Sequence, residues 1–222
     1  MSGDRMEFDL LDHVARFIPV MLSLTVHEWA HAWSAWKLGD DTARLQGRLT
    51  LNPFDHLDPI GTLLPILGVP FGWAKPVPIN PLRFRSNISM STGLWITAIA
   101  GPVSNVLIAV CCGLIIKLMV VFSVDQTKLV AGISFEFLWG TMLVNLLLAM
   151  FNMLPIPPLD GSRIVEATLP DRFRPAWNQF VTLGPALLIG VAVLPLLGVS
   201  LLSGTMHWIV RTISPWLGLD GF

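Results

Sequence analysis

The chain has 222 residues, of which 53% are hydrophobic and 13% are charged, and its formal net charge is −1. Soluble domains usually carry about 25% charged residues, so the composition argues against an ordinary soluble domain and favours a multi-pass membrane protein in the lipid bilayer. A near-neutral chain offers no basic surface for nucleic acid. We predict one all-α, membrane-embedded domain over residues 1–222, with no appended soluble domain.

Five apolar segments are predicted to cross the membrane as a helical bundle. A transmembrane helix needs about 20 apolar residues. In chain order, the predicted spans are about Val14–Trp36, 93–122, Phe135–Leu154, Phe180–Leu197 and Val199–Leu217. The last is the least regular, because it is interrupted by His207, Arg211 and Pro215.

The connection between the first two predicted spans contains three shorter segments. Residues 59–72, "PIGTLLPILGVPFG", are apolar but broken by Gly and Pro, which predicts a re-entrant or interfacial piece. The segments "ARLQGRLTLNP" (43–53) and "WAKPVPINP" (73–81) are bounded by turn residues. They predict short membrane-associated β segments.

Lys and Arg residues are concentrated in two connections, and this asymmetry predicts the orientation. Residues 37–92 contain Lys37, Arg44, Arg48, Lys75, Arg83 and Arg85, and residues 155–176 contain Arg163, Arg172 and Arg174. Residues 123–134 contain only Lys128. We therefore expect the basic connections on the cytoplasmic side of the cell membrane and the N-terminus outside. The first and third spans then end on the same side.

The first predicted span contains the segment "HEWAH". His27 and His31 are four residues apart, so a helix places them on one face, one turn from each other. With Glu28 they form the H-E-x-x-H pattern, in which the glutamate is the general base of a zinc hydrolase. Ionisable side chains cost a few kcal/mol each in a bilayer, and a bound Zn²⁺ would compensate. The alternative is that these side chains hydrogen-bond within the bundle or line a proton path.

Asp160 is the best candidate for the third ligand that a zinc hydrolase needs. It lies in "NMLPIPPLDGSRI", just after the third span, where prolines prevent a regular helix and Gly161 allows a sharp turn. His27 lies about 20 Å along the first span, which leaves about 10 Å to the cytoplasmic face. Both motifs should therefore lie at a similar depth. The alternative for Asp160 is a turn that ends a helix at the membrane surface.

Together, "HEWAH" and "NMLPIPPLDG" resemble the motifs of the site-2 protease family of intramembrane zinc metalloproteases. "GRLTLNPFDHLDPIGT", "FGWAKPVPINP" and "GPVSN" are similar to its small members, which lack PDZ and CBS domains. The resemblance covers roughly residues 20–165. It implies one Zn²⁺ per chain held by His27, His31 and Asp160, with Glu28 as the catalytic base. The implied substrate is a transmembrane helix of a membrane protein, cleaved near the cytoplasmic face.

Three further polar residues are candidates for substrate contacts. The resemblance implies that Asn152 contacts the substrate backbone or the developing oxyanion, and an interhelical hydrogen bond is the alternative. Asn105, in "GPVSN", is suited equally to substrate and to packing contacts. His56, in "FDHLDP", could approach the zinc or could stabilise a turn. Asn145 is expected to make only an interhelical hydrogen bond.

Two other functions would use the same residues. A metal-ion transporter would need a second set of inward-facing carboxylates or histidines along its path, and the spans contain none. A catalytically inactive protein that binds membrane helices would not need Glu28. The sequence therefore favours a protease.

Overall fold

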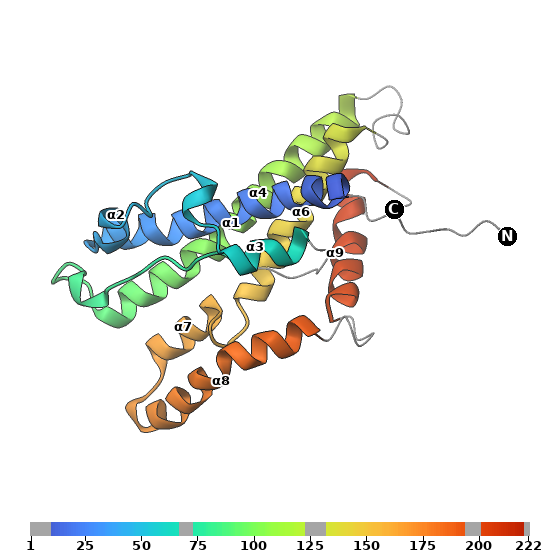
Figure 1. Cartoon of the computed structure of the whole chain (residues 1–222). Helices are drawn as coiled ribbons and strands as arrows, with labels where there is room; N and C mark the ends of the chain where they lie inside the picture. Colours follow the sequence, from blue (N-terminus) through green and yellow to red (C-terminus); the bar gives the residue numbers. More distant parts are fainter. Residues whose placement is uncertain (1–9, 67–72, 123–131, 194–200, 220–222) are drawn as a thin grey trace.

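The computed structural model describes residues 10–66, 73–122, 132–193 and 201–219. These residues form helices joined by loops and short turns (Figure 1). The α-helices are α1 (Leu10–Leu38), α2 (Thr42–Leu45), α3 (Pro59–Ile66), α4 (Met90–Phe122), α6 (Ile133–Asn152), α7 (Asp160–Thr168), α8 (Arg174–Val193) and α9 (Leu201–Leu217). The 3₁₀ turns are η1 (Pro53–Asp55), η2 (Pro81–Arg83) and η3 (Asp171–Phe173).

Each predicted span coincides with a helix, namely α1, α4, α6, α8 and α9 in chain order. Residues 194–197 and 199–200, at the ends of the last two predicted spans, lie outside the described residues. Within the described ranges, α4 and α6 are long and apolar enough to cross a membrane by length and composition. The described part of the chain is therefore helical with two helices that could span a membrane, and the bundle of five spans stays a prediction.

The predicted β segments are not strands in the described part of the chain. Residues 42–45 form helix α2, and the backbone N–H of Thr42 donates to Asp40 Oδ1 at its start (3.0 Å). In the second segment, Ala74 makes one isolated antiparallel bridge with Leu57. Pro76 and Pro78 lack the N–H groups that a longer ladder would need. The segment is extended loop rather than sheet.

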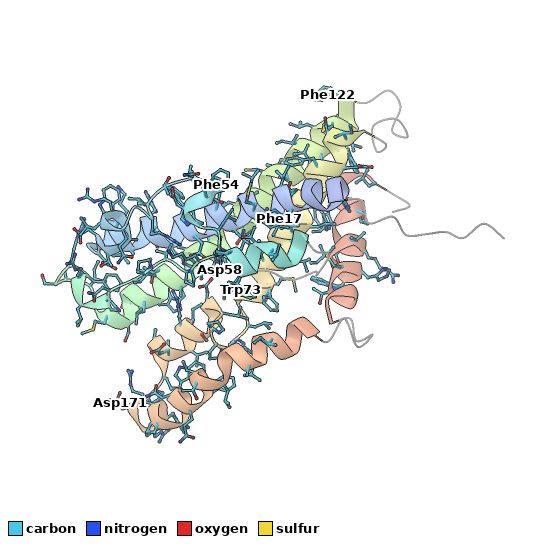
Figure 2. All side chains as sticks on the ribbon, in the orientation of Figure 1. Phe17, Phe54, Asp58, Trp73, Phe122 and Asp171 are labelled. Carbon is cyan, nitrogen blue, oxygen red and sulfur yellow. The ribbon has the colours of Figure 1, made fainter. Side chains whose placement is uncertain are left out.

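The predicted re-entrant piece begins as helix α3, and residues 67–72 lie outside the described residues. Asp58 Oδ1 accepts a hydrogen bond from the N–H of Gly61 at the helix start (2.9 Å). Trp73 lies beside this turn, close to Asp58 (Figure 2). A Cβ on Gly61 would come within 2.9 Å of the backbone nitrogen of Trp73, so the close approach requires glycine. Whether α3 re-enters a membrane stays a prediction.

Helices α1, α4 and α6 pack side by side and form the centre of the molecule (Figure 1). Ala32, Ala35 and Ala98 are fully buried, and such small residues let helices approach closely. An apolar core joins α4, α6 and α9. Its buried members include Ala109, Cys112, Ile116, Phe135, Met142, Leu143, Ile209 and Leu217. Helix α7 packs against α4, which brings the start of α7 toward α1.

Candidate metal centre

The two histidines of α1 face the same point inside the bundle. His27 and His31 are each 3% exposed, and their Nε2 atoms lie 3.0 Å apart. The rings meet edge to face, with 4.6 Å between centroids. The four-residue spacing therefore places both imidazoles on one helix face, as the sequence predicts.

Asp160, the first residue of α7, completes a group of three donors. Its Oδ2 atom lies 3.1 Å from His27 Nε2 and 3.2 Å from His31 Nε2, and the residue is 6% exposed. The chain after α6 turns back tightly, so that a Cβ on Gly161 would overlap the carbonyl groups of Met153 and Leu154. The structure therefore brings together the three residues that the sequence predicts as ligands.

The donor set fits a zinc ion. The three ligand atoms all lie within 4.8 Å of one another, and all three residues are buried. Two imidazole nitrogens and one carboxylate oxygen are donors that Zn²⁺ accepts, and three protein ligands are typical of catalytic sites, which keep one position open. Asp160 would bind zinc as the ionised carboxylate.

Both histidines use their other ring nitrogen to contact α4. His31 Nδ1 lies 2.7 Å from the carbonyl oxygen of Thr97, and His27 Nδ1 lies 2.6 Å from Asn105 Oδ1. A carbonyl oxygen only accepts, so the Nδ1–H of His31 donates and its Nε2 lone pair faces Asp160. Metal-binding histidines commonly donate their second N–H in this way, which fixes the ring orientation.

Gly101 lets α4 approach the two imidazoles. A Cβ at this position would come within 2.7 Å of His27 Nε2 and closer still to His31 Nε2. We expect Gly101→Ala to displace the rings and to lower zinc content well below one ion per chain, because overpacking costs about 1–3 kcal/mol. Metal analysis of the purified variant measures this effect.

Gly140 of α6 provides the matched control, because a Cβ there would meet no atom within 4 Å. Gly140→Ala should keep its zinc, and it should gain stability, since Ala is favoured over Gly in helices by about 1 kcal/mol. Equal zinc content in the two alanine variants would contradict the close approach at Gly101.

Glu28 adjoins His27 on α1 and is held by the loop that precedes α4. Its Oε2 atom accepts a hydrogen bond from the backbone N–H of Val77 (3.0 Å). The same loop is fixed further along, because the N–H of Lys75 donates to the carbonyl of His56 (2.8 Å) and the Arg48 guanidinium donates to the carbonyl of Lys75. Glu28 is thus oriented by the loop and is not one of the three clustered donors.

The other predicted site residues have different surroundings. Asn152 ends α6, and its Nδ2 donates to the carbonyl of Leu148 in the same helix (3.0 Å). The Nε2 of the buried His56 contacts the carbonyl of Thr50 (2.9 Å), which supports the role in turn structure. Asn105 contacts His27, a role that the sequence interpretation missed. Two features of the sequence indicate such a contact. Asn105 lies one turn after Gly101, and a buried amide without a hydrogen-bond partner is costly.

Comparison with known proteins agrees with this geometry. Residues 83–197, about half of the chain, match the model of peptidase family M50. A Bacillus subtilis (strain 168) protein named "Putative zinc metalloprotease YwhC" is 41% identical over 179 residues, which cover 81% of this chain and 80% of the relative. The chain belongs to peptidase family M50. This confirms the predicted resemblance to the site-2 protease family: the chain is a metalloprotease whose cofactor is zinc.

More distant M50 relatives are longer than the region they share with this chain. "Putative zinc metalloprotease Rip2" of Mycolicibacterium smegmatis is 35% identical over 167 residues, which cover 72% of this chain and 60% of the relative. Its namesake in Mycobacterium tuberculosis (strain H37Rv) is 32% identical over 151 residues, 67% of this chain and 55% of the relative. No solved structure matches the chain. The family match includes Asp160 but begins after His31. The proximity of Asp160 to the two histidines is therefore shown by the structure and not by the family match.

Proposed function

We propose that this M50 protein is an endopeptidase that cleaves transmembrane segments of membrane proteins near the cytoplasmic face. The observation that supports this most is the buried group of His27, His31 and Asp160, whose donor atoms lie within 4.8 Å of one another. The group is enclosed by α1 and α4 and by the start of α7, and α4 is apolar and long enough to span a membrane.

In this proposal each residue has a separate role. His27, His31 and Asp160 hold the zinc, which supplies Lewis-acid polarisation of a peptide carbonyl when bound. The Glu28 carboxylate takes the proton of the attacking water and passes it to the leaving amine. The hydrogen bond from Val77 N–H fixes the position of that carboxylate. Asn152, at the end of α6, is the candidate for a contact with the substrate backbone.

A metal-ion transporter is less well supported. Among the described residues, His27, His31 and Asp160 are the one group of three or more His, Cys, Asp or Glu donors that could hold a metal. A path across the membrane would need further sites along it. Glu28, which a purely structural metal site would not need, directly follows His27 on α1 and favours hydrolysis.

We propose that the N-terminus lies outside and that the site opens toward the cytoplasm, on the basis of the basic connections. After replacement of Cys111 and Cys112, Arg44→Cys or Arg172→Cys should react with an impermeant thiol reagent only from the cytoplasmic side. Arg44 and Arg172 are exposed. Lys128→Cys should react only from outside. The opposite labelling pattern would contradict the orientation and the cytoplasmic cleavage site.

Cellular substrates test the proposed function. Membrane proteomes of cells with the wild-type protein and with Glu28→Gln should differ in single-span proteins or single-span fragments, which should accumulate in the variant. The reason is that cleavage stops while the protein stays in place. Membrane proteomes that are identical, with both proteins expressed equally, would contradict the function.

A further inference from the structure

A chain of buried side chains connects His27 to the interior of α6 and the first half of α1. Asn105 Nδ2 donates to Asn145 Oδ1 (2.7 Å), and both residues are fully buried. Asn145 Nδ2 in turn donates to Ser23 Oγ and to the carbonyl of Thr141, at 2.8 Å each. This series of hydrogen bonds joins three helices, α1, α4 and α6, and ends at His27 Nδ1.

At Asn145, the end of this hydrogen-bond series farthest from His27, donation can run in only one direction. The carbonyl oxygen of Thr141 can only accept, so Asn145 must turn its NH₂ group toward it. The Ser23 hydroxyl donates to the carbonyl of Pro19 (2.6 Å) and therefore accepts from Asn145. Both backbone carbonyls impose the same orientation on the Asn145 amide. Its Oδ1 must then face α4.

The same logic continues to the metal group. Asn145 Oδ1 is an acceptor, so Asn105 must present its NH₂ group to it and its own Oδ1 to His27. An amide oxygen cannot donate, so His27 must carry its proton on Nδ1. Its Nε2 lone pair is then directed at Asp160 and His31, where a metal ligand needs it. The other tautomer would place an N–H in the metal site.

We propose that Asn105 and Asn145 are positioning residues that fix the tautomer and ring orientation of His27. The inference rests on the proposed role of His27 as a zinc ligand. The carbonyl of Thr97 fixes the tautomer and ring orientation of His31 directly, whereas two side-chain amides in series fix those of His27. A side-chain substitution can therefore change the tautomer of His27, whereas the partner of His31 is a backbone carbonyl.

The test compares leucine and aspartate at the two positions. Leucine has the branched shape of asparagine, is larger and has no polar atom. A buried, neutral aspartic acid can accept on one oxygen and donate one O–H from the other, which matches the two bonds of Asn105 and replaces one of the two N–H donors of Asn145. Asn105→Leu should weaken zinc binding about 10- to 100-fold, the usual effect of losing the hydrogen-bond partner of a ligand. Asn145→Leu should weaken it less, Asn105→Asp should retain wild-type affinity, and Asn145→Asp should bind zinc more tightly than Asn145→Leu.

Zinc dissociation constants are measured by chelator competition on the purified protein in detergent, together with thermal unfolding. Thr25→Val is the control, because Thr25 is a buried α1 residue whose hydroxyl donates within its own helix, to the carbonyl of Met21 (2.8 Å). A purely structural role would lower unfolding temperatures without separating Leu from Asp in zinc affinity. That result, or wild-type affinity in Asn105→Leu, would overturn the proposal. If Asn105→Leu does not fold, the Asn145 pair decides.

His27→Ala separates this inference from the proposed function. If His27→Ala loses zinc and Asn105→Leu retains it, the positioning role fails and the zinc site stands. If His27→Ala retains stoichiometric zinc at wild-type affinity, His27 is not a ligand, and both the assignment of the site and the positioning role fail.

Discussion

Glu28→Gln is expected to remove nearly all peptide-bond cleavage while leaving the zinc and the fold in place. Glutamine has the volume of glutamate, and its side-chain oxygen can still accept the hydrogen bond from Val77 N–H, but it cannot take a proton from water. Losing a general base typically costs about 10²- to 10⁴-fold in rate. Single-turnover cleavage and zinc content, measured on one preparation, test the two halves of this expectation.

The variant should also trap substrates, because binding does not require the proton transfer. Uncleaved single-span proteins should therefore co-purify with it. Glu136→Gln is the matched control, since Glu136 is an exposed residue in the first turn of α6. Its substitution should change neither the zinc content nor the rate of cleavage. If Glu28→Gln lost its zinc and retained cleavage, Glu28 would be a ligand or a spectator.

Asp160→Ala should lose most of the bound zinc, and cleavage with it. The carboxylate is one of three donors, and its Oδ2 is within 3.2 Å of both histidine Nε2 atoms. Its removal leaves two imidazoles, fewer than the three protein ligands of catalytic zinc sites. His31→Ala should behave in the same way. Zinc per chain, measured by atomic emission after dialysis, should fall from about one to near zero.

Asp171→Ala controls for the loss of a carboxylate. Asp171 forms an exposed ion pair with Arg174 (2.7 Å), and its side chain is 94% exposed; exposed pairs contribute about 0–1 kcal/mol. This variant should retain its zinc and its activity. Stoichiometric zinc in the double variant His27→Ala, His31→Ala would contradict the metal site as assigned.

Much of this site could be predicted from the sequence because its signals are local. A four-residue spacing fixes the relative positions of His27 and His31 on any helix. Gly161 and the prolines before Asp160 predict a chain that turns back, and the structure has such a turn. The five apolar segments predict the helices α1, α4, α6, α8 and α9, because length and composition decide them, although α8 begins at Arg174, before the predicted Phe180.

The contacts between helices could not be predicted in the same way. Helix α4 carries apolar residues on all sides, so hydrophobic periodicity does not mark which face meets α1, and the spacing of Gly101 and Asn105 by one turn is a weak signal. The sequence therefore predicts substrate and packing contacts equally for Asn105, whereas the Asn105 side chain contacts His27 Nδ1 in the structure. The turn residues that bound residues 43–53 and 73–81 predict β structure, but the first segment begins inside helix α2. The second lacks a ladder because the proline nitrogens cannot donate and the N–H groups of Lys75 and Val77 donate to His56 and Glu28.

The position of the cut in a trapped substrate tests the central claim most directly. A single-span protein that co-purifies with Glu28→Gln is reconstituted with the wild-type protein, and the new termini are identified by mass spectrometry. We predict one cut inside the apolar segment of about 20 residues, in its cytoplasmic half, that depends on zinc. Cuts confined to loops outside the membrane, or cleavage that continues after zinc is removed, would contradict intramembrane proteolysis by this site.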